Sequence, residues 1–143
     1  MKMGKTWIIS ILILIVLIVL GMQMQGCGVK IIPQKEVRRE VEFVIVSEEC
    51  IPKEIQSLID TRKEKEMKLT FVDGNDRYII IGYGKQSTGG YSIYIKDLYA
   101  TENALYVDTC LLGPKKGNKR KEAASYPVMV LQIAEMGVPV VFK

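Results

Sequence analysis

The residues of this 143-residue sequence that could catalyse a reaction or bind a metal ion are chiefly its 16 acidic residues and three cysteines. Histidine is absent, which excludes histidine general bases, Ser-His and Cys-His nucleophile pairs, and imidazole ligands. The three cysteines are too scattered to form a zinc site. A hydrolase that uses paired carboxylates would need a fold that brings two acids into one cleft. The sequence therefore predicts a protein that is not an enzyme and holds no cofactor or metal.

Two polar stretches have simpler explanations than catalysis or metal binding. Residues 73–76, Asp-Gly-Asn-Asp, lack the other oxygen ligands of a calcium loop, including its glutamate at the twelfth position, so we expect a hairpin turn. The single basic cluster predicts a solvated loop or, as the alternative, a contact with anionic lipid or wall polymer; its residues are Lys115, Lys116, Lys119, Arg120 and Lys121. Lys2 and Lys5 supply half of the net charge of +4, so the remainder is too small to indicate nucleic acid binding.

A glycine-rich stretch at residues 82–91 separates two strand-like segments. Since no helix follows the glycines, it is not a phosphate-binding loop. Its simplest interpretation is a wide turn or bulge between adjacent strands. The alternative is a sheet edge to which a partner strand or extended ligand adds through backbone hydrogen bonds. The candidate partner-binding residues are Gly84, Thr88, Gly89, Gly90, Tyr91 and Tyr94.

Tyrosines also gather near the glycine-rich stretch. Tyr94 is out of phase with Ile93 and Ile95, so we expect its side chain to be exposed. Tyrosine is common at interfaces, but cross-strand aromatic pairing is its more frequent use in sheets.

The periodicity of apolar residues predicts the elements that position these residues. A first strand is expected over 37–47, and a helix from Pro52 with Ile55, Leu58 and Ile59 on one face. From residue 67 the chain alternates strands and turns, with strands expected over 77–83, 91–99, 104–112, 126–133 and 138–142. The apolar middle of 77–83 indicates a central strand buried on both faces. The predicted fold class is α+β, a mostly antiparallel curved sheet with one helix, or a strongly curved half-barrel.

The N-terminus predicts export. Lys2 and Lys5 precede an apolar run from Thr6 to Met22, which is the pattern of a signal peptide or signal anchor. The lysines favour an orientation that places the later residues outside the membrane. We therefore expect a signal anchor or lipoprotein signal peptide over 1–27, a linker over 28–36 and a domain over 37–143, held at the extracytoplasmic face of the cell envelope.

The sequence leaves the form of anchoring open. Met24-Gln25-Gly26-Cys27 resembles a bacterial lipobox at Gly26 and Cys27, and departs from it at Met24 and Gln25. Cys27 is thus a lipidation candidate, and an uncleaved anchor is the alternative. Cys50 and Cys110 would then be an even pair in a compartment that permits disulfides. They form either a disulfide or two separate thiols.

The later part of the chain resembles a known family. A strand that ends in glycine is followed by Thr88-Gly89-Gly90-Tyr91-Ser92-Ile93, then by a strand with Pro127 and a terminal Val138-Pro139-Val140-Val141-Phe142. Over roughly residues 69–142 this order is similar to the PrcB C-terminal domain family. The family is named for an exported, lipid-anchored subunit of a surface protease complex, and it has no catalytic set to transfer.

These observations predict a non-enzymatic, membrane-anchored module with a protein partner, which the resemblance implies could be an exported protease. The alternative function is an envelope-surface ligand binder that contacts wall polymer or anionic lipid through the tyrosines and the basic loop.

Overall fold

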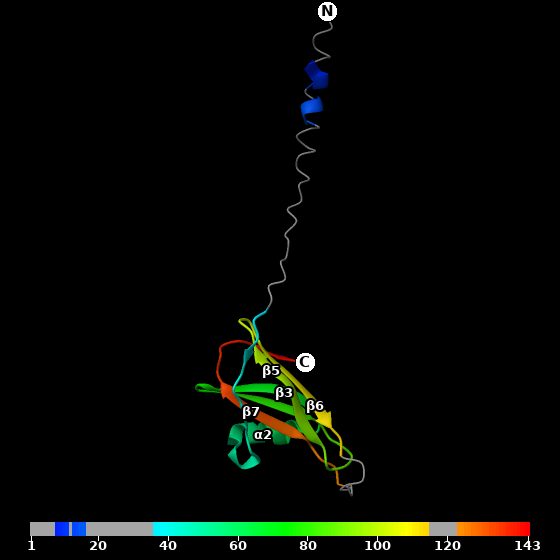
Figure 1. Cartoon of the computed structure of the whole chain (residues 1–143). Helices are drawn as coiled ribbons and strands as arrows, with labels where there is room; N and C mark the ends of the chain where they lie inside the picture. The colour runs from blue at the N-terminus through cyan, green and yellow to red at the C-terminus, as the bar shows by residue number, and fades with distance from the viewer. Residues whose placement is uncertain (1–7, 12, 17–35, 115–122) are drawn as a thin grey trace, which may run out of the picture. The chain divides into compact units, whose positions relative to one another are not determined.

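The computed structural model describes residues 8–11, 13–16, 36–114 and 123–143. The chain divides into two units, Met1–Lys35 and Glu36–Lys143, which are considered separately. In the first unit, residues 8–11 and 13–16 are helical (Figure 1). No helix in the described part of the chain is both long enough and apolar enough to cross a membrane. Cys27, most of the expected anchor and linker, and the basic cluster at 115–121 lie outside the described residues.

The second unit confirms the α+β fold class, with two mainly antiparallel sheets and few helices (Figure 1). Sheet A has the order β1-β5-β6-β8, and sheet B has the order β2-β7-β4-β3. All pairs are antiparallel except β6 and β8, which are parallel. The elements are β1 (Arg39–Glu40), β2 (Val44–Ile45), the 3₁₀ helix η2 (Glu48–Cys50), α2 (Lys53–Arg62), β3 (Glu66–Asp73), β4 (Asp76–Tyr83), β5 (Ser92–Ala100), β6 (Leu105–Leu112), β7 (Val128–Ala134) and β8 (Val140–Phe142).

Two expectations about strand arrangement were wrong. The glycine-rich stretch does not join adjacent strands, because β4 belongs to sheet B and β5 to sheet A. The expected strand over 37–47 is two short strands, one in each sheet, since β1 pairs with β5 and β2 pairs with β7. The chain passes between the sheets four times, between β1 and β2, β4 and β5, β6 and β7, and β7 and β8; residues 41–43 and 84–91 form the first two of these crossings.

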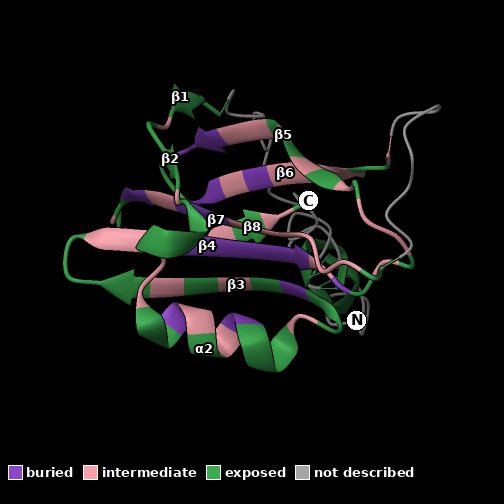
Figure 2. Ribbon diagram, turned by 90° about the horizontal axis from the view of Figure 1, so that it is seen from below, coloured by how far each residue is buried: buried purple, intermediate pink, exposed green. Residues whose placement is uncertain are grey.

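β4 is the central buried strand, as its apolar sequence predicted. It lies between β3 and β7, and every residue from Tyr78 to Gly82 is buried (Figure 2). Ile79 and Ile81 pack with Leu105 and Val107 of sheet A on one face. On the other face, Ile80 packs against α2 in a second apolar cluster, whose buried residues also include Ile55, Ile59, Met67, Tyr78 and Val130. The order of layers is thus α2, sheet B, sheet A.

A β-bulge in β5 keeps its apolar residues on the core face. The β5–β6 register shifts between Ile95 and Asp97, and Ile95 and Leu98 both pack against the cluster between the sheets. In a regular strand, residues three apart would point to opposite faces. The extra residue of the bulge shifts the alternation by one position, so that Ile95 and Leu98 point to the same face.

Arg77 and Glu135 join β4 to the turn after β7. Arg77 donates from Nε and Nη2 to the two carboxylate oxygens of Glu135, both at 2.6 Å, and from Nη1 to the carbonyl of Val138. Gly137 N–H donates to the same carboxylate at 2.6 Å. The side chains are only 12% and 21% exposed, so this bidentate pair is better shielded from water than the other ion pairs of the described residues.

The pair predicts a loss of stability in acid. The hydrogen bond from Arg77, followed by the one from Gly137, lowers the pKa of Glu135 below its ordinary value of 4.5. The carboxylate therefore contributes stability above the unfolded pKa, and this contribution is lost as the pH falls through the lowered folded pKa. Urea unfolding at a series of pH values should show that Glu135→Gln is less stable than the parent at pH 7 and converges with it in acid. A constant difference at every pH would contradict the assignment.

The glycine-rich crossing is fixed by close backbone packing. Gly84 has φ +68°, and a Cβ there would lie 3.1 Å from the backbone nitrogen of Glu66 and 3.1 Å from the carbonyl carbon of Lys65. Gly74, in the turn between β3 and β4, has φ +58° with nothing within 4 Å of such a Cβ. Both positions favour glycine because of their positive φ, but only Gly84 is crowded. Substitutions at the two positions can therefore be compared to isolate the effect of crowding.

We expect Gly84→Ala to lower the free energy of unfolding by roughly 2–4 kcal/mol, because positive φ and crowding against backbone both cost stability. Gly74→Ala should cost only about 1 kcal/mol, from the backbone conformation alone. Urea titration of both variants measures the difference. Equal losses would mean that the approach of residues 64–66 to Gly84 contributes nothing.

Candidate functional site

The six residues predicted for partner binding lie along the sheet crossing and the first part of β5. Gly84 is buried; Thr88, Gly89 and Tyr91 are half-buried; Gly90 and Tyr94 are exposed. The carbonyl of Thr88 accepts a hydrogen bond from Ser125 Oγ at 2.7 Å. A Cβ on Gly90, where φ is +90°, would lie 3.0 Å from Cβ of Pro114. Much of the stretch is therefore committed to contacts within the domain, and Tyr94 is its most accessible large side chain.

Two tyrosines of sheet A form a cross-strand pair. Tyr99 of β5 stacks on Tyr106 of β6 with their ring centroids 4.9 Å apart and an interplanar angle of 16°. The Arg38 guanidinium lies 4.2 Å from the Tyr99 ring centroid. Lys143 Nζ donates to Tyr99 Oη at 2.8 Å, a hydrogen bond that raises the pKa of Lys143. These rings are covered by cations and by each other, so they stabilise the sheet and offer little surface to a ligand.

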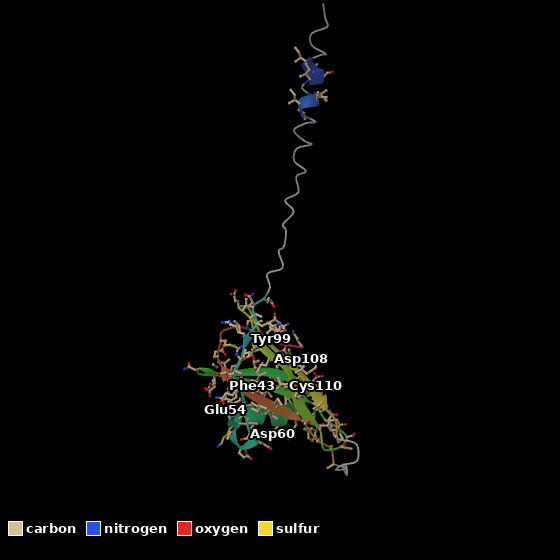
Figure 3. The ribbon with its side chains drawn as sticks, viewed as in Figure 1. Phe43, Glu54, Asp60, Tyr99, Asp108 and Cys110 are labelled. Carbon is tan, nitrogen blue, oxygen red and sulfur yellow. The ribbon has the colours of Figure 1, made fainter. Side chains whose placement is uncertain are left out.

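The two described cysteines are free thiols. Cys50 is exposed at the end of η2, and Cys110 is half-buried in β6. Figure 3 shows Cys110 near Asp108 on β6, whereas Glu54 and Asp60 mark α2. Among the described residues, no group of acidic and cysteine side chains is placed to hold a metal ion.

Among the described residues of the second unit, the run of consecutive large apolar side chains that are exposed is the short strand β2 and the residue before it. Phe43, Val44 and Ile45 are 41%, 62% and 56% exposed, and we call them the β2 ridge. Phe43 lies in the connection between β1 and β2, whereas Val44 and Ile45 form β2, the edge strand of sheet B next to β7. Figure 2 shows β2 as an exposed element. Contiguous exposed apolar side chains typically mark an interaction surface.

A hollow lies on each side of the β2 ridge. One, which we call the α2–β7 groove, has a volume of about 390 Å³ and runs between α2, the start of β7 and the first part of β5. Its lining includes Ile45, Val46, Ile51, Ile59, Lys63, Ile93, Tyr126, Val128 and Met129. The other has a volume of about 680 Å³, and its lining includes Val41, Phe43, Val44, Asp76, Gln132 and Ala134. The ridge therefore contributes residues to both hollows.

The α2–β7 groove is lined by both apolar and charged side chains. Lys63 Nζ donates to Asp60 Oδ1 at 2.8 Å, and Gln56 Nε2 donates to Asp60 Oδ2 at 3.4 Å. The Lys63 hydrogen bond lowers the pKa of Asp60 and raises that of Lys63, so both remain charged at neutral pH. Lys63 Nζ also lies 5.8 Å from the centroid of the Tyr126 ring. Protein interfaces commonly combine apolar and polar residues in this way.

Sequence reasoning missed the β2 ridge and Tyr126. A signal for the ridge was present, since residues 43–46 are four consecutive apolar residues between Glu42 and Ser47. Such a run indicates a strand that is apolar on both faces. Whether those faces are buried or exposed depends on the tertiary arrangement, which the run itself does not encode. Tyr126 lies next to Pro127 at a strand start, and its place beside Lys63 depends on the position of α2.

Comparison with known proteins links the centre of this domain to one family. Residues 77–134 match the model of the family described as PrcB C-terminal. The match runs from β4 to β7, which is narrower than the expected 69–142, and includes the glycine-rich crossing, Ile93, Tyr126 and Val128. No match was found among curated proteins or solved structures. Residues 77–134 of this chain carry the PrcB C-terminal pattern, which confirms the resemblance predicted from the sequence.

Proposed function

We propose that this chain is a non-enzymatic, membrane-anchored extracytoplasmic module that binds a protein partner and supports the assembly or stability of a surface protease complex. The family match supports a PrcB-like role, and the name of that family suggests a protease complex. The observation that carries the proposal is the β2 ridge, with three large apolar side chains exposed between two hollows. The lack of any histidine in the sequence supports a role without catalysis.

The β2 ridge has the physical properties of an interface centre. Apolar surface removed from water contributes roughly 25 cal/mol per Å², so covering three large apolar side chains supplies a favourable free energy of binding. The hollows on either side let a partner enclose the ridge instead of touching only its crest. The ion pair of Asp60 and Lys63 lies at one rim, where water remains available to it.

The anchoring part of the proposal rests on the sequence of residues 1–27. We expect the full chain to stay with membranes through washes in high salt and to be released only by detergent. Intact mass then distinguishes the two anchors, because a lipoprotein would begin at a modified Cys27, whereas an uncleaved anchor would retain residues 1–26 unmodified. Recovery of the chain in the soluble fraction would contradict both forms.

Site-specific photocrosslinking tests partner binding at the β2 ridge. A photoreactive amino acid at Val44 of the full chain in its own membrane should give a discrete adduct with an exported protease, identified by mass spectrometry. The same group at Thr70, an exposed position of β3, is the matched control and should not give that adduct. Val44→Asp should reduce recovery of the partner at least tenfold, because a charge would be placed in the apolar contact, and Thr70→Asp should not. Identical adducts from both positions, or none from either, would contradict the proposal.

The alternative function predicts a different result in the same membranes. A binder of wall polymer or anionic lipid would give no protein adduct from Val44. It would sediment with vesicles that contain anionic lipid or with purified wall, and would be released as salt rises, because electrostatic attraction is screened. Contact through the β2 ridge is apolar and should persist at the same salt concentrations.

A further inference from the structure

We infer that the α2–β7 groove binds an extended segment of the partner by strand addition to the free edge of β7. This inference rests on the proposed function and specifies its chemistry: the ligand is a peptide in the β conformation whose backbone pairs with Tyr126 and Val128. The chain's own β2 already occupies the neighbouring part of the same edge.

The pairing of β2 with β7 does not extend to the start of β7. Val44 and Ile45 lie opposite Gln132 and Leu131, and Val46 N–H donates to the carbonyl of Val130 at 2.9 Å. The chain then turns away into η2 at residues 48–50. The backbone hydrogen bonds of residues 44–46 along the outer side of β7 therefore end at Val130.

The backbone groups beyond this point face the groove. Tyr83 N–H donates to the carbonyl of Pro127 at 3.1 Å, and Ser125 exchanges two backbone hydrogen bonds with Gln86. Residues 125 and 127 thus direct their backbone groups toward β4 and the segment that follows it. Since backbone groups alternate sides along a strand, those of Tyr126 and Val128 point the opposite way. Within the described residues, neither forms a backbone hydrogen bond on that side.

Pro127 does not interrupt this free edge. Proline lacks an N–H donor, and this usually confines it to sheet edges or strand starts. Here residue 127 presents its backbone to β4, so the missing donor is on the inner side. Tyr126 and Val128 still offer two N–H donors and two carbonyl acceptors to the groove. Spaced two residues apart, these groups match the hydrogen-bonding period of a single added strand.

The walls of the groove match the alternating side chains of an added strand. Ile51 and Ile59 line it from the side of η2 and α2, and Ile93 and Met129 line it toward sheet A. Side chains of a β-strand alternate between the two faces, so successive residues of the ligand would contact the two walls in turn. A compact ligand could fill the hollow but would leave the free backbone groups unpaired. The two free donors and two free acceptors of the edge therefore favour an extended peptide as the ligand.

Backbone methylation tests this mode directly. The probe is the hexapeptide acetyl-Val-Thr-Val-Thr-Val-Thr-amide, N-methylated either at every second nitrogen or at every nitrogen. The first version keeps one strand edge able to donate hydrogen bonds, whereas the second keeps none and has the same side chains. With the full chain in detergent micelles, we expect the half-methylated peptide to bind at least tenfold more tightly than the fully methylated one. Equal affinities would mean that apolar contact alone accounts for binding, and no binding of either would also overturn the inference.

Amide hydrogen exchange locates the bound peptide. At saturating half-methylated peptide, exchange at Tyr126 and Val128 should slow at least tenfold, while the amides of β3, the opposite edge of sheet B, should not change. Protection of β3 instead would place the added strand on the other edge and overturn the inference. Ile93→Ala should weaken binding of the peptide about tenfold, and Val72→Ala, a matched apolar truncation on β3, should leave it unchanged. If the photocrosslink from Val44 forms while these results fail, partner binding stands and strand addition does not.

Discussion

The burial of β4 on both faces is the constraint on which the rest of this domain depends. Ile79 and Ile81 face sheet A, whereas Tyr78 and Ile80 face the α2 side. A strand with two apolar faces must be covered by two layers, or it would expose a continuous apolar strip to water. Pairing with β3 on one side and β7 on the other satisfies its backbone groups. The three-layer order follows from this one strand, and the crossings between the sheets follow from the layers.

The same arrangement leaves strand edges uncovered. The segment that contains β1 and β2 is short and divided between two sheets, so it pairs with only two residues of β5 and extends along β7 no farther than Val130. Phe43 in the connection between these strands and Val44 at the start of β2 are both exposed. A longer β2 would have paired with the edge of β7 beyond Val130. The surface that we propose for partner binding is thus a direct result of where the chain leaves sheet B.

Local features of this fold could be read from the sequence, but the pairing of distant strands could not. The turn at Gly74, the buried face of α2 with Ile55 and Ile59, and the burial of β4 each depend on residues close together in the chain. The parallel contact of β8 with β6 and the assignment of β5 to the other sheet depend on loop paths that periodicity does not record. The candidate site was predicted less completely than the fold, because the exposure of an apolar run such as 43–46 depends on the tertiary structure. The glycines were recognised, but their role was not, since the backbone that approaches Gly84 comes from residues 64–66.

The glycine-rich crossing and the proposed binding edge are two parts of one structure. Gly84 lets the chain pass close to residues 64–66, and Gln86 then pairs with Ser125, whose hydroxyl also donates to Thr88. These bonds hold the segment before β7 from its inner side, which directs the backbone of Tyr126 and Val128 outward. The hydrogen bonds of Gln86 and Thr88 thus join the crossing to the segment before β7. The glycines of the crossing therefore support binding by fixing the edge that a partner would use, and the family match over 77–134 spans both features.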